Sequence, residues 1–310
     1  MDLQGEKEKY LEYCKVQKEL DGKTIKAYRI DLNQFIIFIN QYEQNINKQN
    51  LNQYLSHIHC LYKQKTIKRK IASVKAFLRY LEEEEIIEIN PFHKIKTKFK
   101  EEIILPKIIP RNMIEELLRY LYKEVEKEGT IEKYILRDIV IIETLFATGL
   151  RISELCNLRD STFDISEGVL CIKGKGRKER YLQIGSEEVL GVIRKYRDEF
   201  ADKISNHGYF FVNKWGGPLS EQSARRMLNK YARKLWTDKN ITPHMFRHSF
   251  ATYLMEEDVN IRYIQKLLGH SSITTTQIYT YVAMEKEREI LRTRHPRNKM
   301  NANLLSNSLM

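Results

Sequence analysis

The chain has 310 residues, 42% hydrophobic and 30% charged, which is long enough for two domains with separate cores, although a single domain is the alternative. Without a bilayer-spanning apolar run or a signal-peptide pattern, we expect a soluble intracellular protein. Lys and Arg outnumber Asp and Glu by 53 to 41, a net charge of +12 spread along the chain. A polyanion is the natural partner, and nucleic acid is favoured over an acidic membrane because no basic amphipathic helix with an aromatic face is evident.

Three helical patterns occupy the first ninety residues. A threonine-capped pattern starts at Thr24, a short helix covers 51–62, and a third helix starts at Thr66. On the third helix an apolar stripe faces a core, and basic side chains lie elsewhere on its surface: Lys68, Arg69, Lys75 and Arg79. We expect these cations to meet phosphates, while simple solvation of an exposed face is the alternative for each.

Asn90-Pro91 ends the helical unit, because the residue before proline is pushed out of the helical region. The stretch 94–110 is charge-dense, carries two prolines and shows no sustained period, as expected of a linker. We place the boundary near Lys100. The expected divisions are a helical domain at 1–95, a linker at 96–110, a second domain at 111–297 and a disordered Asn- and Ser-rich tail at 298–310.

The second domain opens with helical patterns at 111–127 and 131–148, and Gly149 suits a left-handed helix end. Ser153 or Arg151 lies at the start of another helix, so we expect Arg151 to be held at a helix end. Strands at 169–172 and 179–184 predict a β-hairpin with a flexible, basic loop. The loop matches neither the P-loop nor the dinucleotide pattern, so we expect it to present a lysine to a phosphate and not to bind a nucleotide.

A further strand is predicted at 209–212, before a helix capped by Ser220 or Ser223. That helix is densely cationic around an apolar seam, with these expected DNA contacts: Arg225, Arg226, Lys230 and Arg233. We favour contact with a DNA groove over an ordinary solvated amphipathic helix. The four cysteines show no paired spacing, and we expect reduced core residues instead of a disulfide or zinc framework.

The stretch 242–283 gathers polar side chains. Thr242 as N-cap and Pro243 at the first helical position predict a helix on which His244 and Arg247 project from nearly the same side. Gly269 closes a second helix, and Ser271 or Ser272 caps a third that carries the tyrosine at 279.

Each of these side chains has an ordinary alternative explanation. A helical tyrosine such as Tyr279 is more often packing than a nucleophile, and His270 could satisfy a helix-terminal carbonyl. His244 and His248 have the spacing of metal ligands, but the zinc-protease glutamate is absent and Arg247 would repel a cation.

In combination, the motifs are specific. They occur in this order: GLRISEL at 149–155, GKG at 174–176, TPHMFRH at 242–248, LLGH at 267–270 and TTQIYT at 275–280. The chain resembles the tyrosine recombinase (phage integrase) family, most closely its Xer-type members, over nearly its whole length. The resemblance implies a mainly α fold with a small antiparallel β-sheet, in which a helical core-binding domain precedes a mixed α+β catalytic domain.

The resemblance also implies roles for individual residues. Tyr279 is the expected nucleophile, forming a 3′-phosphotyrosyl link and freeing a 5′-hydroxyl. Arg151 and Arg247 hold the scissile phosphate, and Lys175 protonates the leaving oxygen, although two other lysines share its loop. Tyr281 is the alternative nucleophile by proximity.

Three further positions complete the expected site. His244 assists proton transfer, His270 donates to the phosphate, and Glu154 orients its neighbours. Phe246 stands where the family usually has leucine, which is a packing change. No metal, ATP or other cofactor is implied, because the covalent intermediate stores the phosphoester energy.

The expected partner is a double-stranded DNA recombination site, bound by a homotetramer on two duplexes or by a heterotetramer with a second recombinase, and not a membrane. We expect a cytoplasmic, nucleoid-associated enzyme. Its biological task could be dimer or cointegrate resolution or element integration. Two alternatives are a type IB topoisomerase-like nicking and closing enzyme and a non-catalytic DNA-binding protein.

Overall fold

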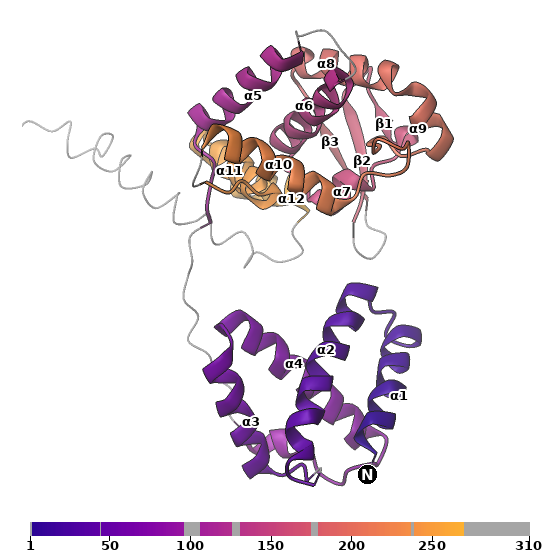
Figure 1. Ribbon diagram of the computed structural model, residues 1–310, viewed down its shortest axis with the longest axis vertical. Helices are drawn as coiled ribbons and strands as arrows, with labels where there is room; N and C mark the ends of the chain where they lie inside the picture. The colour runs from indigo at the N-terminus through magenta and orange to yellow at the C-terminus, as the bar shows by residue number, and fades with distance from the viewer. Residues whose placement is uncertain are drawn as a thin grey trace, which may run out of the picture. The chain divides into compact units, whose positions relative to one another are not determined.

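A computed structural model gives the fold of the chain (Figure 1). The chain divides into two compact units, 1–101 and 102–310, which we describe separately. The structure describes these residues: 2–43, 45–95, 106–125, 131–174, 179–236 and 239–269. The expected tail at 298–310, much of the expected linker and the expected helix around Tyr279 lie outside them.

The first unit is helical. Its elements are α1 (Leu3–Val16), α2 (Gly22–Asn40), α3 (Lys48–Leu61), α4 (Gln64–Glu83) and the short 3-10 helix η1 (Pro91–Lys94). The predicted cap at Thr24 was wrong: α2 starts earlier, because Asp21 accepts hydrogen bonds from the backbone N–H groups of Lys23 and Thr24. The sequence patterns also missed α1, which packs against α2 and α4.

The α4 helix buries the stripe that the sequence predicted, including Ile67, Val74 and Phe77. The same helix also buries a charged residue, between Ile67 and Val74. Lys70 is 2% exposed and donates to Asp31 on α2, which is itself fully buried. An apolar helix face thus carries one buried ion pair as well as its hydrophobic contacts.

The second unit combines helices with a small sheet. The helices are α5 (Arg111–Val125), α6 (Ile131–Thr148), α7 (Ile152–Cys156), η2 (Asp160–Thr162), α8 (Glu187–Glu199), α9 (Ala201–His207), α10 (Glu221–Leu235), α11 (Pro243–Glu256) and α12 (Ile261–Leu268). Because α6 is apolar and packs against α5, α8 and α11, it forms the centre of this unit (Figure 1).

The sheet has three antiparallel strands in the order β1-β2-β3. They are β1 (Phe163–Asp164), β2 (Val169–Lys173) and β3 (Glu179–Gln183). The β2–β3 hairpin confirms the predicted pair of strands, with Lys173 opposite Glu179 at the end next to the connecting loop. The predicted strand at 209–212 was wrong. Only isolated bridges form there, and Phe210 and Phe211 are apolar because they fill the core.

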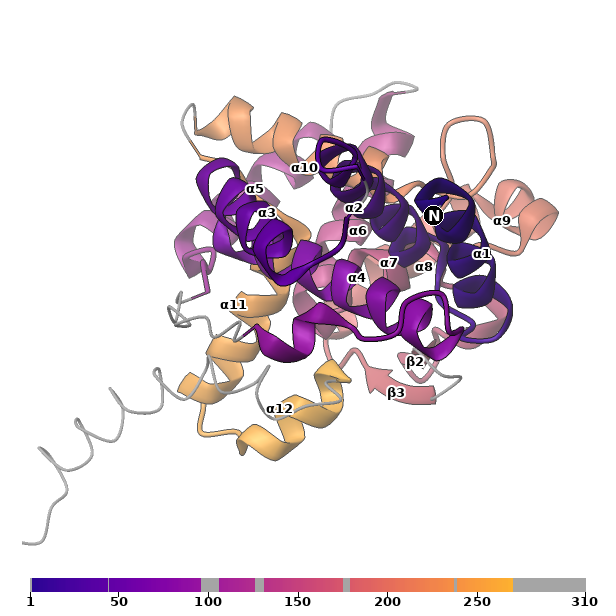
Figure 2. The same ribbon diagram turned by 90° about the horizontal axis from the view of Figure 1, so that it is seen from below.

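Local signals fix the helix ends that surround the cleft described below. Gly149 has a φ of 61°, and a Cβ at this position would lie 2.5 Å from the Phe250 side chain, so glycine is required. Thr242 caps α11 by accepting from the backbone of Met245, and Gly269 ends α12 in the left-handed region, as predicted. The α12 helix contacts both α11 and β3 (Figure 2).

The cysteine prediction was partly wrong. Cys14 and Cys156 are buried and Cys171 is half-buried, but Cys60 is exposed on the outer side of α3, so it is not a core residue. All four are free thiols.

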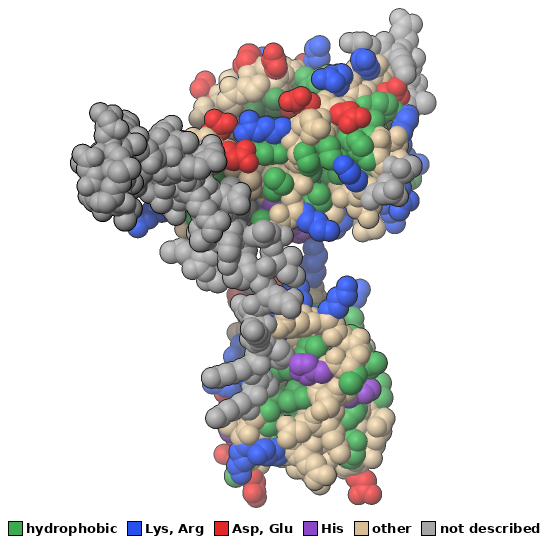
Figure 3. All heavy atoms as spheres, turned by 90° about the vertical axis from the view of Figure 1, so that its left-hand side faces the viewer, with side chains coloured by type: hydrophobic (Ala, Val, Ile, Leu, Met, Phe, Trp, Pro, Cys, Tyr) green, Lys and Arg blue, Asp and Glu red, His purple; other side chains and the backbone are tan. Residues whose placement is uncertain are grey.

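Charge on the surface is mixed. Figure 3 shows Lys and Arg side chains interspersed with Asp and Glu over the faces of the two units that it presents. Within the described part of the chain, no helix combines the length and the apolar composition needed to cross a membrane.

Candidate functional site

Arg247 lies on the second turn of α11 and is 5% exposed. Its Nη1 donates to the carbonyl of Gly149 at 2.8 Å, and its Nη2 donates to the carbonyl of Leu268 at 2.6 Å. One guanidinium group therefore ties the turn before α7 to the last residue of α12.

Arg151 stands at the N-terminus of α7, and its side chain is 37% exposed. Its Nη1 donates to Glu154 Oε1 at 3.0 Å, and its Nη2 donates to the carbonyl of Gly269 at 3.4 Å. The backbone N–H of Arg151 also donates to Glu154 Oε2 at 2.9 Å, which is the glutamate half of a capping box. Arg151 thus joins the start of α7 to the end of α12.

Arg180 on β3 completes the cluster, and the sequence patterns missed it. It forms a bidentate pair with Glu154, with nitrogen-to-oxygen distances of 2.9 and 2.8 Å, and its Nε donates to the carbonyl of Leu267 at 3.0 Å. Side chains alternate between the two faces of a strand, and no local motif specified that Arg180 would lie on the face toward Glu154. Two features of the sequence could have pointed to Arg180. It lies just beyond the basic loop, and Glu154 had no assigned partner.

The Glu154 carboxylate accepts from both arginines and is only 9% exposed. Burial alone would raise its pKa, but hydrogen bonds from Arg180 and from the Arg151 backbone, with the charges of both side chains, hold the pKa below its usual range. Glu154 therefore stays ionised at neutral pH and fixes the two guanidinium groups.

Three successive carbonyl groups at the end of α12 each accept from a different arginine. Leu267 accepts from Arg180, Leu268 from Arg247, and Gly269 from Arg151. These carbonyls have no acceptor role inside their own helix, and the helix dipole makes them partially negative. The carbonyl groups at the end of α12 therefore hold the three arginines close together without a ligand.

An open cleft adjoins this cluster. It is lined by residues from α7, η2, the β2–β3 hairpin and α12, and its cationic members are Arg151, Arg159, Lys173, Arg180 and Lys266. A cleft with these five cations and two carboxylates, Glu154 and Glu179, suits an anionic ligand such as a phosphate.

The remaining predicted residues fall in two groups. His244 is exposed on the first turn of α11, whereas Arg247 on the same helix is buried. Lys175, His270 and Tyr279 lie outside the described residues. Burial, with the nearby charges of His244 and Arg247, lowers the pKa of His248 to about 4.

The predicted DNA-contacting cations on α10 do not line this cleft, and those on α4 belong to the first unit. On α4, Arg69 pairs with buried Asp31, Lys75 Nζ lies 5.4 Å from the Phe92 ring centroid, and Arg79 pairs with Glu83. Lys68, also on α4, is half-buried.

On α10, Arg225 pairs with Glu221 on the preceding turn. The side chains of Arg226, Lys230 and Arg233 are exposed. This exposed row leaves α10 a cationic face of the predicted kind.

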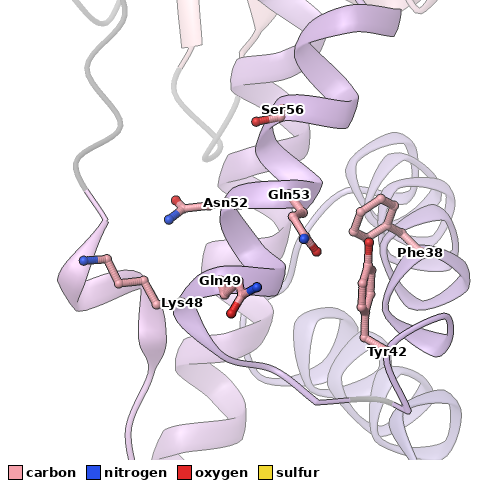
Figure 4. Close-up of a pocket in the computed structure, with 7 residues that line it drawn as sticks. All are labelled: Phe38, Tyr42, Lys48, Gln49, Asn52, Gln53 and Ser56. Carbon is pink, nitrogen blue, oxygen red and sulfur yellow. The ribbon is translucent and has the colours of Figure 1, made fainter.

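A second hollow lies on the first unit, between α3 and the end of α2 (Figure 4). Gln53 points toward the rings of Phe38 and Tyr42, and the other lining residues are Lys48, Gln49, Asn52 and Ser56. This set has hydrogen-bonding amides but no acid, base or nucleophile pair. Across the described ranges, no three His, Cys, Asp or Glu side chains gather into a potential metal site.

Comparisons with known proteins agree with this geometry. The model of the phage integrase family matches residues 109–286, and that of the phage integrase N-terminal SAM-like domain matches residues 8–85. A crystal structure of the XerH site-specific recombinase, bound to a palindromic difH substrate, shares the fold with a TM-score of 0.72. It is 22% identical, and the match covers 91% of this chain and 83% of that chain.

Two curated relatives match almost end to end. A tyrosine recombinase of Agathobacter rectalis is 51% identical over 299 residues, covering 96% of this chain and 98% of its own. The tyrosine recombinase XerC of Staphylococcus saprophyticus is 33% identical over 295 residues, covering 94% and 97%. With a family model over more than half of its length and these relatives, the chain belongs to the phage integrase family of tyrosine recombinases.

Proposed function

We propose that this chain is a site-specific tyrosine recombinase that cuts and rejoins DNA through a 3′-phosphotyrosyl intermediate. The observation that carries the proposal is the convergence of Arg151 and Arg247, from distant parts of the sequence, on the end of α12 beside a cationic cleft. The names of the curated relatives favour recombination over a topoisomerase-like or a non-catalytic role.

The two arginines bind the scissile phosphate by exchanging partners. Each donates to a neutral carbonyl, and Arg151 donates to Glu154 as well, whereas a phosphate oxygen is a stronger, charge-assisted acceptor than a carbonyl. Arginine suits this task because its planar fork donates in pairs and keeps its charge. Binding therefore exchanges bonds to neutral carbonyls for charge-assisted bonds to the phosphate, without assembling a new site.

The chemistry is a transesterification. The Tyr279 hydroxyl attacks phosphorus, the bond from phosphorus to the 5′-oxygen breaks, and Lys175 supplies the proton that the leaving oxygen takes up. His244 assists by accepting the proton that the Tyr279 hydroxyl loses as it attacks. The phosphotyrosyl bond retains the energy of the phosphodiester, so the 5′-hydroxyl of a partner strand can reverse the step and join new ends.

The remaining site residues stabilise charge. The arginines Arg151 and Arg247, with a hydrogen bond from His270, neutralise the non-bridging oxygens as the transition state forms. Glu154 holds Arg151 and needs no contact with DNA.

The two units share the DNA. Residues 1–95 form the core-binding domain, 96–110 the linker and 111–297 the catalytic domain, followed by a tail at 298–310. Cations on α4 and α10 contact the duplex. Four protomers, of one kind or two, act on two recombination sites in the cytoplasm, at the nucleoid.

A nicked suicide substrate tests the proposal. Cleavage of this substrate releases the short strand whose 5′-hydroxyl is needed for religation. An enzyme that cleaves therefore stays covalently attached and migrates as an adduct on a denaturing gel. We expect an adduct with the wild-type chain and with Tyr281→Phe, and none with Tyr279→Phe, although all three bind the site alike. An adduct that survives in Tyr279→Phe and disappears in Tyr281→Phe would refute the choice of nucleophile.

A further inference from the structure

The Arg180 side chain joins three parts of the second unit. Its strand follows the hairpin loop, its two Nη atoms bind Glu154, and its Nε binds the last turn of α12 at Leu267. The side chain is 12% exposed. All three of its nitrogen atoms thus have protein acceptors in an arrangement that only a planar guanidinium group can satisfy.

Arg151 contrasts with Arg180 in the same cluster. Its side chain is 37% exposed, and its bond to the Gly269 carbonyl is long at 3.4 Å. A phosphate can therefore draw Arg151 away from that carbonyl. Arg180 gains less from a phosphate, because its bidentate carboxylate partner is already charged and buried.

We propose that Arg180 is a positioning residue for strand cleavage. It holds Glu154 and the end of α12 in fixed register, and so presents Arg151 to the scissile phosphate. The inference rests on the proposed function. It extends that function to a residue on β3 that does not itself touch the reacting atoms.

Removal of Arg180 has a definite physical consequence. Glu154 loses two of its donors while remaining buried, so its carboxylate competes with the phosphate for the donors of Arg151. The carbonyl of Leu267 also loses its donor, two residues before Gly269. A misplacement of about 1 Å in such a site can cost about a hundredfold in rate.

The test separates binding from cleavage with Arg180→Gln in the full-length chain. We expect binding of the recombination site within about twofold of wild type. Single-turnover adduct formation on the suicide substrate should fall by about a hundredfold. Arg197→Gln is the matched control, because Arg197 forms a bidentate pair with Asp160 at 2.9 and 3.0 Å, and we expect it to cleave normally.

A modified substrate distinguishes positioning from a general loss of structure. Replacing a non-bridging oxygen of the scissile phosphate with methyl removes the charge that Arg151 neutralises. The deficit of Arg180→Gln should therefore shrink on this methylphosphonate. It should also shrink in an Arg151→Lys background, because the two changes remove one shared interaction. An equal deficit on both substrates would mean that Arg180 only maintains the fold, which overturns the proposal.

Other outcomes are equally decisive. If Arg180→Gln does not fold, Arg180→Lys takes its place, since it keeps the charge and loses the fork. Cleavage by the folded variant within about twofold of wild type overturns the inference alone. Absence of an adduct from the wild-type chain overturns the proposed function together with it.

Discussion

Two charged clusters, one in each unit, differ in what their cations bind. In the first unit, Asp31 is fully buried and accepts from Arg69, from Lys70 at 3.0 Å and from Ser73 at 3.0 Å. In the second unit, cations donate to backbone carbonyls at the end of α12 as well as to one carboxylate. The first cluster directs its two cations at one buried carboxylate, whereas the second directs three arginines at one carboxylate and a row of neutral carbonyl groups.

This difference teaches how a functional cluster is recognised. A buried carboxylate paired with a buried lysine stabilises a fold only while both partners are present, and it offers nothing to a ligand. Arginines held by neutral carbonyls remain able to bind an anion, and Arg151 is exposed enough to do so. The group that accepts from the cations, more than the number of cations, distinguishes a structural cluster from one that can bind an anion.

The largest expected effect is on the first cluster. Asp31→Ala leaves Lys70 buried without its carboxylate, and we expect α2 and α4 to lose about 3–5 kcal/mol of stability. Amide hydrogen exchange on the full-length chain measures this loss. Glu83→Gln is the control, because its pair with Arg79 is exposed and screened by solvent, so its loss should change stability little. Similar losses in the two variants would contradict the contrast between the clusters.

A second comparison lies within the catalytic cluster. Arg151→Gln and Arg247→Gln should each lower the single-turnover cleavage rate by at least roughly a hundred- to a thousandfold, as for a lost oxyanion donor. Only Arg247→Gln should also lower the free energy of unfolding measurably, because Arg247 is 5% exposed and binds two carbonyls. Equal stability of the two variants in denaturant would show that Arg247 has no structural role.

The pH dependence of stability reports the burial of His248, next to Arg247 on α11. His248 is neutral in the native state because burial and nearby charges lower its pKa to about 4, whereas the unfolded value is about 6.5. Its contribution is therefore complete above pH 6.5 and is lost as the pH falls toward 4.

Unfolding of wild type and His248→Asn, measured in denaturant across this range, isolates the histidine. We expect the stability of wild type relative to the variant to decline as the pH falls. Buried Asp138 and Glu143 have raised pKa values and act in the opposite direction, but they are common to both proteins and cancel. Parallel curves would exclude a native-state pKa this low.

The smallest expected effect concerns α10. Loss of one phosphate contact reduces the salt dependence of DNA binding by about one unit of slope, so Arg226→Gln should do so. Arg225→Gln should change the slope less, because Arg225 already pairs with Glu221. Binding titrations at several salt concentrations measure both slopes. Identical slopes for wild type and Arg226→Gln would remove this residue from the predicted interface.

Local chemistry in the sequence determined most elements around the site. Thr242 and Pro243 start α11, glycines at 149 and 269 end helices in the left-handed region, and the β2–β3 hairpin forms where the pattern placed it. These features depend on residues within one or two turns. The pattern failed at 209–212. The two phenylalanines there are apolar because they are buried in the core, and this apolar run was mistaken for a strand.

The tertiary structure alone decided how the arginines are held. Arg180 lies 26 residues from Glu154 and 87 residues from Leu267, and no local pattern relates these positions. Their contacts exist because β3 and α12 pack against each other. The sequence by itself determined which side chains could bind a phosphate, and the packing of a strand against a helix end decided which of them are fixed and which can turn toward it.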